Sequence, residues 1–387
     1  MSISKVFPSE PATPAARNSI RGSKVFPSEP ATASARSSIS KVFPSERVAP
    51  FGIGGGWRVT QLAIALALLL LVAAGTARAQ GSLGGQRAGT SSATFLRIGV
   101  GARAVGMGET FVAVANDPSA IYWNPAGLAS LQRRELSISH VQWPADIAYD
   151  HVTFTLPSRR FGGSFAIQAG LLGTQIDETS ELQPFGTGRS FSYTDFITGV
   201  AYSRRWTDKL LVGLGVKYVH EDLGSQVGGP TTSAFLFDVG SIYYLGIGSV
   251  RIATSLTNFG SALRPEGSYT SPYDGTTSQF DAFDPPLMFR YGVAFEPIEN
   301  DTQRLTTALE VSQPADNEQL VKAGVEWMFR HTFALRSGYN LRADAMKFSA
   351  GTGFSGDFGN FRGVIDYAYT DGGPLGSVHR LSLGLRF

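Results

Sequence analysis

The sequence predicts an all-β protein: an antiparallel transmembrane β-barrel of about 14 strands. Three observations predict this architecture. Residues 132–387 alternate apolar and polar side chains, a signal for export precedes them, and the connections between the alternating segments differ in length. Apolar residues at every second position of a strand form one continuous face, which in a closed barrel faces lipid.

The alternation separates apolar side chains from charged residues and glycine. Even positions from 210 to 218 carry Leu, Val, Leu, Val and Tyr, whereas Gly213 and Lys217 lie between them. The segments 287–296, 320–330 and 361–370 show the same contrast. Many segments approach the length of about nine to eleven residues that a tilted membrane strand needs, and their number is even. The expected strands are 136–143, 151–157, 163–172, 191–203, 209–220, 234–245, 249–258, 287–296, 303–312, 320–330, 332–340, 345–354, 361–370 and 378–387.

The connections provide a second test of the barrel. If the chain enters from the periplasm, every other connection, beginning with the first, lies outside the cell. The three longest connections, 173–190, 221–233 and 259–286, all fall in this external set, and no connection of the other set exceeds six residues. Long external loops and short periplasmic turns are typical of bacterial outer-membrane barrels. The expected location is therefore the cell outer membrane.

Aromatic residues at the ends of the strands fit the interfacial girdles of such barrels, although aromatic residues favour strands in general. The residues in question are Trp143, Tyr202, Trp206, Tyr339 and Phe387. Phe387 ends the chain, and we expect it to serve as the insertion signal that the barrel assembly machinery reads.

Residues 57–79 have the features of a secretory signal peptide. Trp57-Arg58 precedes an apolar run from Leu62 to Ala74, and Ala77-Arg-Ala79 follows it. A basic start, a short apolar core and a small-x-small site indicate cleavage between Ala79 and Gln80. A membrane-spanning helix would need roughly 20 apolar residues.

Residues 1–56 form a low-complexity extension. The heptapeptide Ser-Lys-Val-Phe-Pro-Ser-Glu occurs three times, beginning at Ser4, Ser23 and Ser40, in a background rich in Pro, Ala, Ser and Arg. These short units have neither a helix nor a strand period, so we expect this extension to be disordered. Two origins remain open, a start codon assigned upstream of the true one and an extended targeting region.

Residues 80–94 are rich in Gly, Ser and Thr and are expected to form a flexible linker, and the plug follows at 95–131. The plug lacks strand alternation. We expect a short helix within 103–115, a turn at 116–118, and a helical turn at 119–123 before Asn124-Pro125.

Composition excludes several function classes. The 387 residues carry 33 Lys and Arg against 31 Asp and Glu, a net charge of +2, which gives no electrostatic footprint for nucleic acid. The absence of cysteine excludes disulfides and thiolate metal sites. No phosphate-binding loop is present, and the five histidines lack metal-ligand spacing, although His140 and His151 on neighbouring strands are candidates to meet. We therefore expect no cofactor.

The sequence also argues against an enzyme. His379 and Ser382 differ in parity on the last strand, so they cannot form a local catalytic dyad on the outer wall. Carboxylates predicted to face the lumen are matched by cations, which predicts salt-bridge networks rather than an acid–base pair. The two sets are Asp238, Glu296, Glu310, Glu326 and Asp366, against Lys217, Arg251, Arg290, Lys322 and Arg362.

The block from Phe95 to Ala129, with Gly-Met-Gly at 106–108 and Asn-Pro-Ala-Gly-Leu at 124–128, resembles the N-terminal signature of the PorV/PorQ family of outer-membrane barrels. Ile365-Asp-Tyr-Ala-Tyr-Thr370 and His379-Arg-Leu-Ser-Leu383 are similar to the C-terminal block of PorV. That family is related to the FadL-like transporters. The resemblance spans residues 95–387 and implies a barrel of about 14 strands with an N-terminal plug segment of short helices and turns folded inside it. The plug motif comprises Gly106, Met107, Gly108, Asn116, Asp117, Pro118, Asn124, Pro125 and Gly127.

The resemblance implies a component of the type IX secretion system, whose partners would be secreted proteins with a C-terminal signal domain and other secretion components. The longest connection, 259–286, is then the expected cargo loop, with Tyr269, Tyr273, Phe280 and Phe283 as its contact residues. The alternative is a FadL-like passive transporter of hydrophobic small molecules, which a kinked strand beside the plug would favour. A third possibility is a barrel that scaffolds other envelope proteins.

Overall fold

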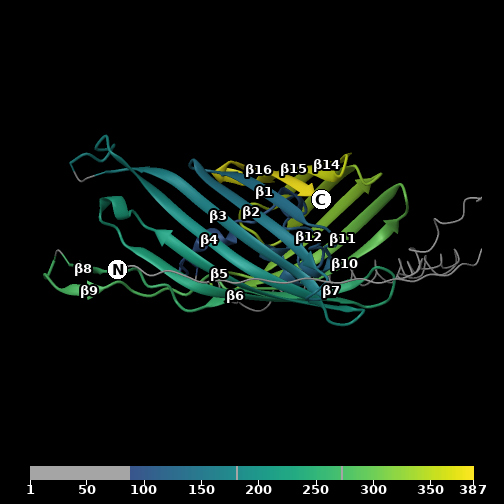
Figure 1. Cartoon of the computed structure of the whole chain (residues 1–387). Helices are drawn as coiled ribbons and strands as arrows, with labels where there is room; N and C mark the ends of the chain where they lie inside the picture. Colours follow the sequence, from purple (N-terminus) through teal and green to yellow (C-terminus); the bar gives the residue numbers. More distant parts are fainter. Residues whose placement is uncertain (1–87, 180–181, 272) are drawn as a thin grey trace, which may run out of the picture. The chain divides into compact units, whose positions relative to one another are not determined.

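The computed structural model describes residues 88–387 except 180, 181 and 272. The predicted extension, the signal peptide with its Ala79–Gln80 cleavage site and residues 80–87 of the linker lie outside the described residues. Fourteen antiparallel strands form a closed barrel in which β1 pairs with both β2 and β16 (Figure 1), so the predicted fold class is confirmed. The barrel strands are β1 (Glu135–Trp143), β2 (Ile147–Ser158), β3 (Gly163–Asp177), β4 (Ser190–Arg205), β5 (Leu210–Asp222), β6 (Thr231–Tyr244), β7 (Arg251–Gly260), β10 (Met288–Glu299), β11 (Gln303–Pro314), β12 (Leu320–Phe329), β13 (Phe333–Asn340), β14 (Phe348–Phe358), β15 (Phe361–Asp371) and β16 (Ser377–Arg386).

The two faces of the strands are those that the alternation predicted. On β5, Leu214 and Val216 are exposed on the outer wall, whereas Lys217 points into the lumen and is only 4 % exposed. On β12, Val325 is exposed and Glu326 is fully buried. The exterior is thus the apolar, lipid-facing surface of a membrane barrel. In the described part of the chain, no helix combines the length and the apolar character needed to cross a membrane.

The barrel has a loop end and a turn end, as the connection lengths predicted. The loop end carries residues 144–146, 178–189, 223–230, 261–287, 315–319, 341–347 and 372–376, and the turn end carries 159–162, 206–209, 245–250, 300–302, 330–332 and 359–360. The first loop is shorter than expected: it has three residues, 144–146, and the chain reverses there with positive φ at Ala145 and Asp146. The longest loop contains an unpredicted two-stranded sheet of β8 (Ser268–Thr270) and β9 (Thr277–Gln279), which projects from the barrel (Figure 1).

One of the aromatic residues assigned to the girdles lies elsewhere. Trp143 faces the lumen, where the guanidinium of Arg380 lies 5.5 Å from its ring, because it shares the parity of the buried Val141. Tyr339 and Phe387 are about half exposed on the outer wall, and Trp206 is exposed at the turn end. Strand parity therefore separates Trp143 from the girdle residues.

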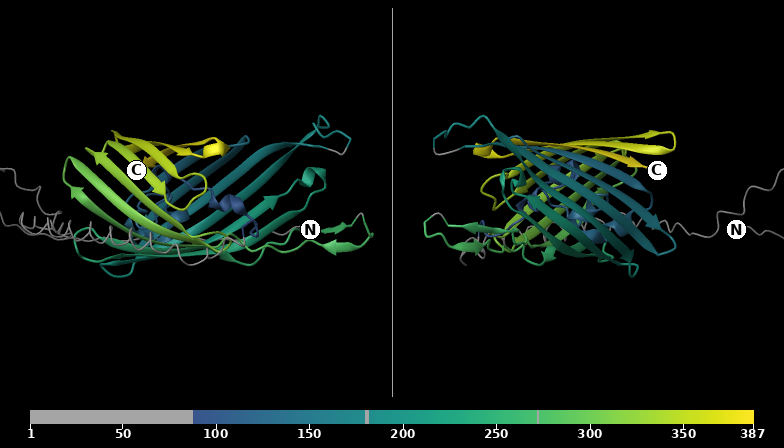
Figure 2. Two further views of the ribbon diagram at one scale, coloured as in Figure 1. Left: turned by 180° about the vertical axis from the view of Figure 1, so that it is seen from behind. Right: turned by 60° about the vertical axis from the view of Figure 1, so that its left-hand side comes forward.

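The plug fills the barrel with short helical elements (Figure 2). These are η3 (Thr94–Arg97), α2 (Ala102–Gly106), α3 (Ala120–Trp123) and η4 (Pro125–Ser130). The helix expected within 103–115 ends at Gly106, because Gly108 and Glu109 adopt left-handed φ values that terminate a helix. The plug also begins before residue 95: Ser91 forms a bridge with Asp284 and Ala93 is buried, so this part of the expected linker is docked.

Candidate functional site

Glycines of the barrel wall let the plug approach closely. Gly338 of β13 contacts the backbone of Met107 and Gly108, and a Cβ atom at residue 338 would overlap both. Gly108 has a φ of 67°, a conformation that glycine adopts without strain. Wall glycines on four other strands face the plug in the same way: Gly213, Gly240, Gly292 and Gly324. Glycines at lumen-facing positions of the strands therefore make room for the plug.

The two asparagine-containing turns hold the plug's own backbone. Asn124 accepts a hydrogen bond from the N–H of Ala126 at 3.1 Å and donates to the carbonyls of Val112 and Ser241. The carboxylate of Asp117 accepts hydrogen bonds from both the N–H and the hydroxyl of Ser119. The remaining motif residues Gly106, Met107, Pro118, Pro125 and Gly127 are all buried within the plug or against the wall. These contacts place most of the motif in the packing of the plug, whereas Asn116 is exposed and accepts a hydrogen bond from Arg103 at 2.6 Å.

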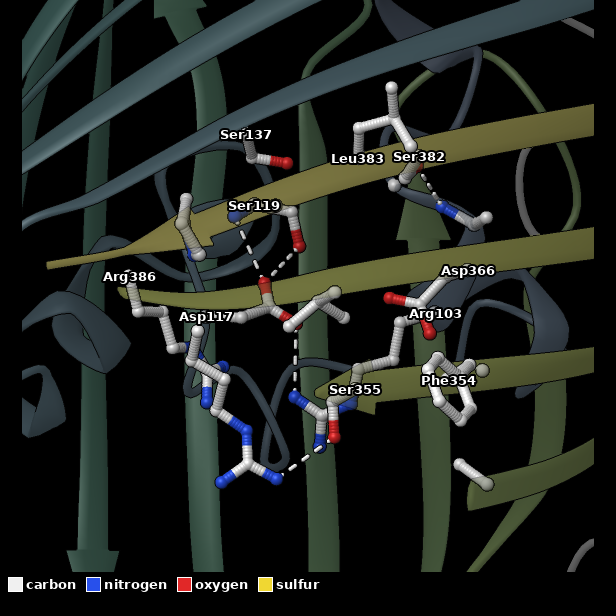
Figure 3. Close-up of a pocket in the computed structure, with 18 of the residues that line it drawn as sticks. Arg103, Asp117, Ser119, Ser137, Phe354, Ser355, Asp366, Ser382, Leu383 and Arg386 are labelled. Carbon is white, nitrogen blue, oxygen red and sulfur yellow. Dashed lines mark hydrogen bonds and ion pairs between the residues drawn. The ribbon is translucent and has the colours of Figure 1, made fainter. Parts of the chain in front are cut away.

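A network of five charged residues joins the plug to the wall. Arg103 of α2 makes two hydrogen bonds to Glu326, at 2.8 and 2.9 Å, and one to Asp117 at 3.0 Å. Arg336 of β13 donates to the same Glu326 at 2.7 Å and to Asp366 at 2.6 Å. Figure 3 shows Asp117 between Ser119 and Arg103 beside the cavity. Burial alone would lower the pKa of Arg103, but the carboxylates of Glu326 and Asp117 outweigh it and raise that pKa.

A second set of contacts fixes the turn after α2. The carboxylate of Glu310 accepts the backbone N–H groups of Phe111 and Val112, both at 2.9 Å. Glu109 forms an ion pair with Lys322 at 3.0 Å. Burial would raise the pKa of the Glu109 carboxyl, but Lys322 and Arg380 outweigh it, so the pKa lies below its ordinary value. Glu109 is therefore charged at neutral pH.

Only some of the lumen charges form the ion pairs within the wall that the sequence predicted. Lys217–Asp238 at 2.8 Å and Arg251–Glu296 at 2.9 Å are ion pairs within the wall, as expected. Lys322 and Glu326 instead bind plug residues, and Arg103, Glu109 and Arg336 were not predicted. Lumen parity on the strand from 332 to 340 identifies Arg336, but no sequence pattern indicates which wall carboxylate a plug residue reaches.

The first plug residues are fastened at the loop end. The carboxylate of Glu221 accepts hydrogen bonds from the hydroxyl of Ser92 at 2.6 Å and the N–H of Ala93 at 2.9 Å. Arg97 forms an ion pair with the buried Asp316 of the loop 315–319. These polar contacts hold residues 91–97, the seal segment, across the lumen.

An aromatic cluster lies in the lumen beneath the seal segment. The ring centroid of Phe95 is 6.3 Å from that of Tyr149 on β2, and Tyr122 packs edge-on against Trp123 at 4.8 Å. Phe111 packs edge-on against Trp123 at 6.3 Å. All five side chains are buried and belong to one apolar core with Ile197, Val219 and Leu236 of the wall. The lumen of a water-filled porin is lined by polar side chains, whereas this part of the lumen is filled by apolar and aromatic ones.

Three cavities lie at the turn end of the plug. Their volumes are about 280, 200 and 440 Å³, and Asn116 lines all three. Arg362 and Arg386 line two of them, together with Glu135, which forms an ion pair with Arg386 at 3.0 Å. Figure 3 shows Arg386, Ser355 and Arg103 around the first cavity. Charged side chains of both signs make these cavities polar.

The predicted histidine contacts are only partly present. His140 and His151 do not meet, because His140 points outward to Asp150 at 2.7 Å and His151 points inward to Gln168 at 3.1 Å. Ser382 faces the plug and accepts the N–H of Ala102, as parity predicted. On the outer wall, His379 lies 3.1 Å from Ser377 Oγ, with the Tyr367 phenol at 2.7 Å from its other ring nitrogen. The third partner is thus a phenol rather than the carboxylate of a serine-hydrolase triad.

The four residues of the expected cargo loop are split between two places. Tyr273 is 97 % exposed between β8 and β9, and Tyr269 is half exposed with its ring 5.5 Å from that of Phe280. Phe283 instead lies at the base of the loop, where its backbone pairs with that of Leu263. The hairpin therefore presents Tyr269, Tyr273 and Phe280 without Phe283.

Comparisons with known proteins agree with this architecture. A model of the uncharacterised protein family UPF0164 matches residues 71–201, and no curated protein matches the chain. The barrel is similar to the TodX deltaS2S3 mutant monoaromatic hydrocarbon channel, with a TM-score of 0.51 and 12 % identity over 74 % of this chain and 98 % of that one. The Ralstonia pickettii toluene transporter TbuX and the Pseudomonas putida toluene transporter TodX give TM-scores of 0.49 and 0.48, each with 14 % identity over 74 % of this chain and 97 % of theirs. At 12 % identity the likeness to the TodX deltaS2S3 mutant channel shows the fold alone, and the resemblance to PorV/PorQ stays a prediction.

Proposed function

We propose that this protein is an outer-membrane barrel that passively transports small hydrophobic molecules, as the FadL-like transporters do. The observation that carries this proposal is the apolar aromatic cluster of Phe95, Tyr149, Tyr122, Trp123 and Phe111 in the lumen. All five side chains are buried in this conformation, so a solute would reach them only when the plug moves. A hydrophobic solute would then gain free energy by contact with the cluster, whereas ions and sugars would lose hydration there. Similarity of fold to hydrocarbon channels supports the same choice.

Irregular pairing of the wall beside the plug also supports transport. The register between β6 and β7 shifts between Phe237 and Val239, and Asn258 adopts a φ of 64° at the bulge. Asn258 donates its backbone N–H to Asp238 at 2.8 Å, so the bulge is tied to a lumen carboxylate. A bulge bends a strand and interrupts its ladder. This is the type of strand distortion that we expect in a barrel whose solute passes through the wall.

Uptake by whole cells tests this function. We expect a host expressing the full chain to take up radiolabelled toluene faster than the same host with an empty vector, and to show no gain for a polar solute such as glucose. The chain has no native cysteine, so Ala102→Cys with Ser382→Cys introduces one cross-link between α2 and β16, where N–H and hydroxyl are 2.8 Å apart. Oxidation should block uptake and reduction should restore it. Equal toluene uptake with and without the protein would refute transport.

The exposed hairpin favours a second function, the secretion of proteins and their attachment to the cell surface. Tyr269, Tyr273 and Phe280 expose aromatic surface to solvent, which is typical of binding patches. Affinity purification from detergent-solubilised membranes separates the two proposals. Recovery of secreted proteins that share a C-terminal domain supports the secretion function, and copurification of lipid without protein removes it. Tyr273→Ser should reduce that recovery, whereas toluene uptake should be unchanged.

A further inference from the structure

The connections at the two ends of the barrel carry opposite charge. Residues in the turn-end connections, together with 131–134 before β1, include six cations and two carboxylates: Arg133, Arg134, Arg159, Arg160, Lys209 and Arg330, against Asp208 and Asp301. The loop-end connections contain four cations and ten carboxylates when residues 178–189 are counted in full. A net positive rim at one end and a net negative rim at the other give the barrel an electrostatic polarity along its axis.

Guanidinium groups at the turn end lie over aromatic rings, two of which are exposed. Arg160 is 5.9 Å from the ring centroid of Phe161, Arg204 is 5.9 Å from that of Trp206, and Arg330 is 5.2 Å from that of Phe329. Phe161 and Trp206 are 57 % and 68 % exposed. The other guanidinium–aromatic pairs of the described residues lie inside the lumen. The three pairs come from three different turns, between β2 and β3, β4 and β5, and β12 and β13.

This combination fits one class of partner. Aromatic side chains on a membrane barrel sit at the level of the lipid headgroups. A guanidinium stacked beside such a ring is held at the same depth, and its planar donors match a phosphate group. We propose that the turn-end rim, defined as Arg160, Phe161, Arg204, Trp206, Phe329 and Arg330, binds the headgroups of anionic glycerophospholipids in the adjacent leaflet.

The loop end differs from the turn end in its charge, so we expect the preference for anionic lipids at one leaflet only. Its outer wall carries His140, His220 and His379, and its loops carry the excess of carboxylates. Anionic headgroups are repelled there and attracted at the turn end. The turn-end rim therefore fixes the orientation and the depth of the barrel relative to the anionic leaflet.

Quenching of Trp206 fluorescence by brominated lipids tests this proposal on the full mature chain. We expect brominated phosphatidylglycerol to bind near Trp206 more tightly than brominated phosphatidylcholine, and Trp206→Phe to identify the signal of this residue. Each rim arginine should contribute about a fivefold preference, so Arg160→Gln/Arg204→Gln/Arg330→Gln should lose about 100-fold. The matched control Arg189→Gln/Arg264→Gln/Lys347→Gln changes three exposed cations at the loop end and should keep the preference.

The wild-type protein also provides a test that needs no variant. Attraction between exposed charges is screened by salt, so the preference for phosphatidylglycerol should fall between 0.1 and 1 M NaCl, conditions in which the Debye length shortens from about 10 to about 3 Å. Equal affinity for both lipids, a preference that salt leaves unchanged, or a triple rim variant with the wild-type preference would each overturn the proposal.

Discussion

At the loop end the first plug residues are fastened to the wall, whereas at the turn end the plug borders three polar cavities. The fastening consists of a few contacts, those of Ser92 and Ala93 with Glu221 and of Arg97 with Asp316. The rest of the plug is held by the Arg103 network and the wall glycines. The seal segment is thus held by fewer polar contacts than the rest of the plug.

The largest loss of stability is expected when the Arg103 network is broken. Glu326→Gln removes the fully buried carboxylate that both Arg103 and Arg336 contact, and it leaves two buried guanidinium groups short of charge. We expect the free energy of unfolding to fall by about 3 to 5 kcal/mol. Urea unfolding in lipid vesicles measures this loss.

Asp357→Asn is the matched control for Glu326→Gln. The side chain of Asp357 is 75 % exposed and lies 3.9 Å from Arg362, so its replacement should cost less than about 1 kcal/mol. Equal losses for the two variants would contradict the assignment of the plug's anchorage to the Arg103 network.

The next largest loss of stability is expected where the plug packs against a wall glycine. Gly338→Ala places a methyl group into the backbone of Met107 and Gly108, and we expect it to destabilise the seated plug by about 3 kcal/mol. Faster cleavage of the plug by added protease measures this change. Gly215→Ala on β5 is the control, because the nearest atom to its Cβ would lie 3.4 Å away, at ordinary contact distance. If both variants are cleaved at the same rate, close glycine contact does not hold the plug.

The seal segment predicts a smaller effect. Glu221→Gln weakens the hydrogen bonds to Ser92 and Ala93, and we expect a loss of about 1 kcal/mol. In a Leu96→Cys background, where residue 96 is buried, labelling by an external maleimide should accelerate about fivefold. Glu266→Gln changes an exposed carboxylate at the same end and should leave the rate unchanged. Acceleration by both variants would show that net loop charge, rather than the seal, controls access.

Acidification is expected to destabilise the plug, because Glu109 loses its charge at low pH. The pKa of Glu109 lies below its ordinary value of 4.5, so its contribution to stability is fully present above pH 4.5 and is lost as the pH falls through the lower, folded-state value. Unfolding of the plug followed between pH 7 and pH 3 should show this loss in the wild type. Glu109→Gln should flatten that part of the profile, and Glu318→Gln, in an exposed position, should not. Identical profiles for wild type and Glu109→Gln would assign the acid loss to other groups.

Much of the wall could be predicted because period-two alternation is a local property. Leu214 and Val216 point outward and Lys217 inward because neighbouring residues of a strand face opposite sides. The hairpin of β8 and β9 was missed because its strands are only three residues long and fully exposed, so no apolar stripe marks them. Trp143 was misplaced because an aromatic residue at a strand end fits either face until the register is known.

The sequence by itself determined the barrel, the order of its strands and the asymmetry of its two ends, and the resemblance to PorV/PorQ implied the N-terminal plug. The alternation and the connection lengths depend on residues close together in the chain. Only the tertiary structure decided that Glu326 holds Arg103, 223 positions away, that Glu221 holds Ser92, and that Gly338 receives Gly108. Such pairs depend on how the plug is rotated within the closed barrel, and side-chain alternation contains no information about that rotation.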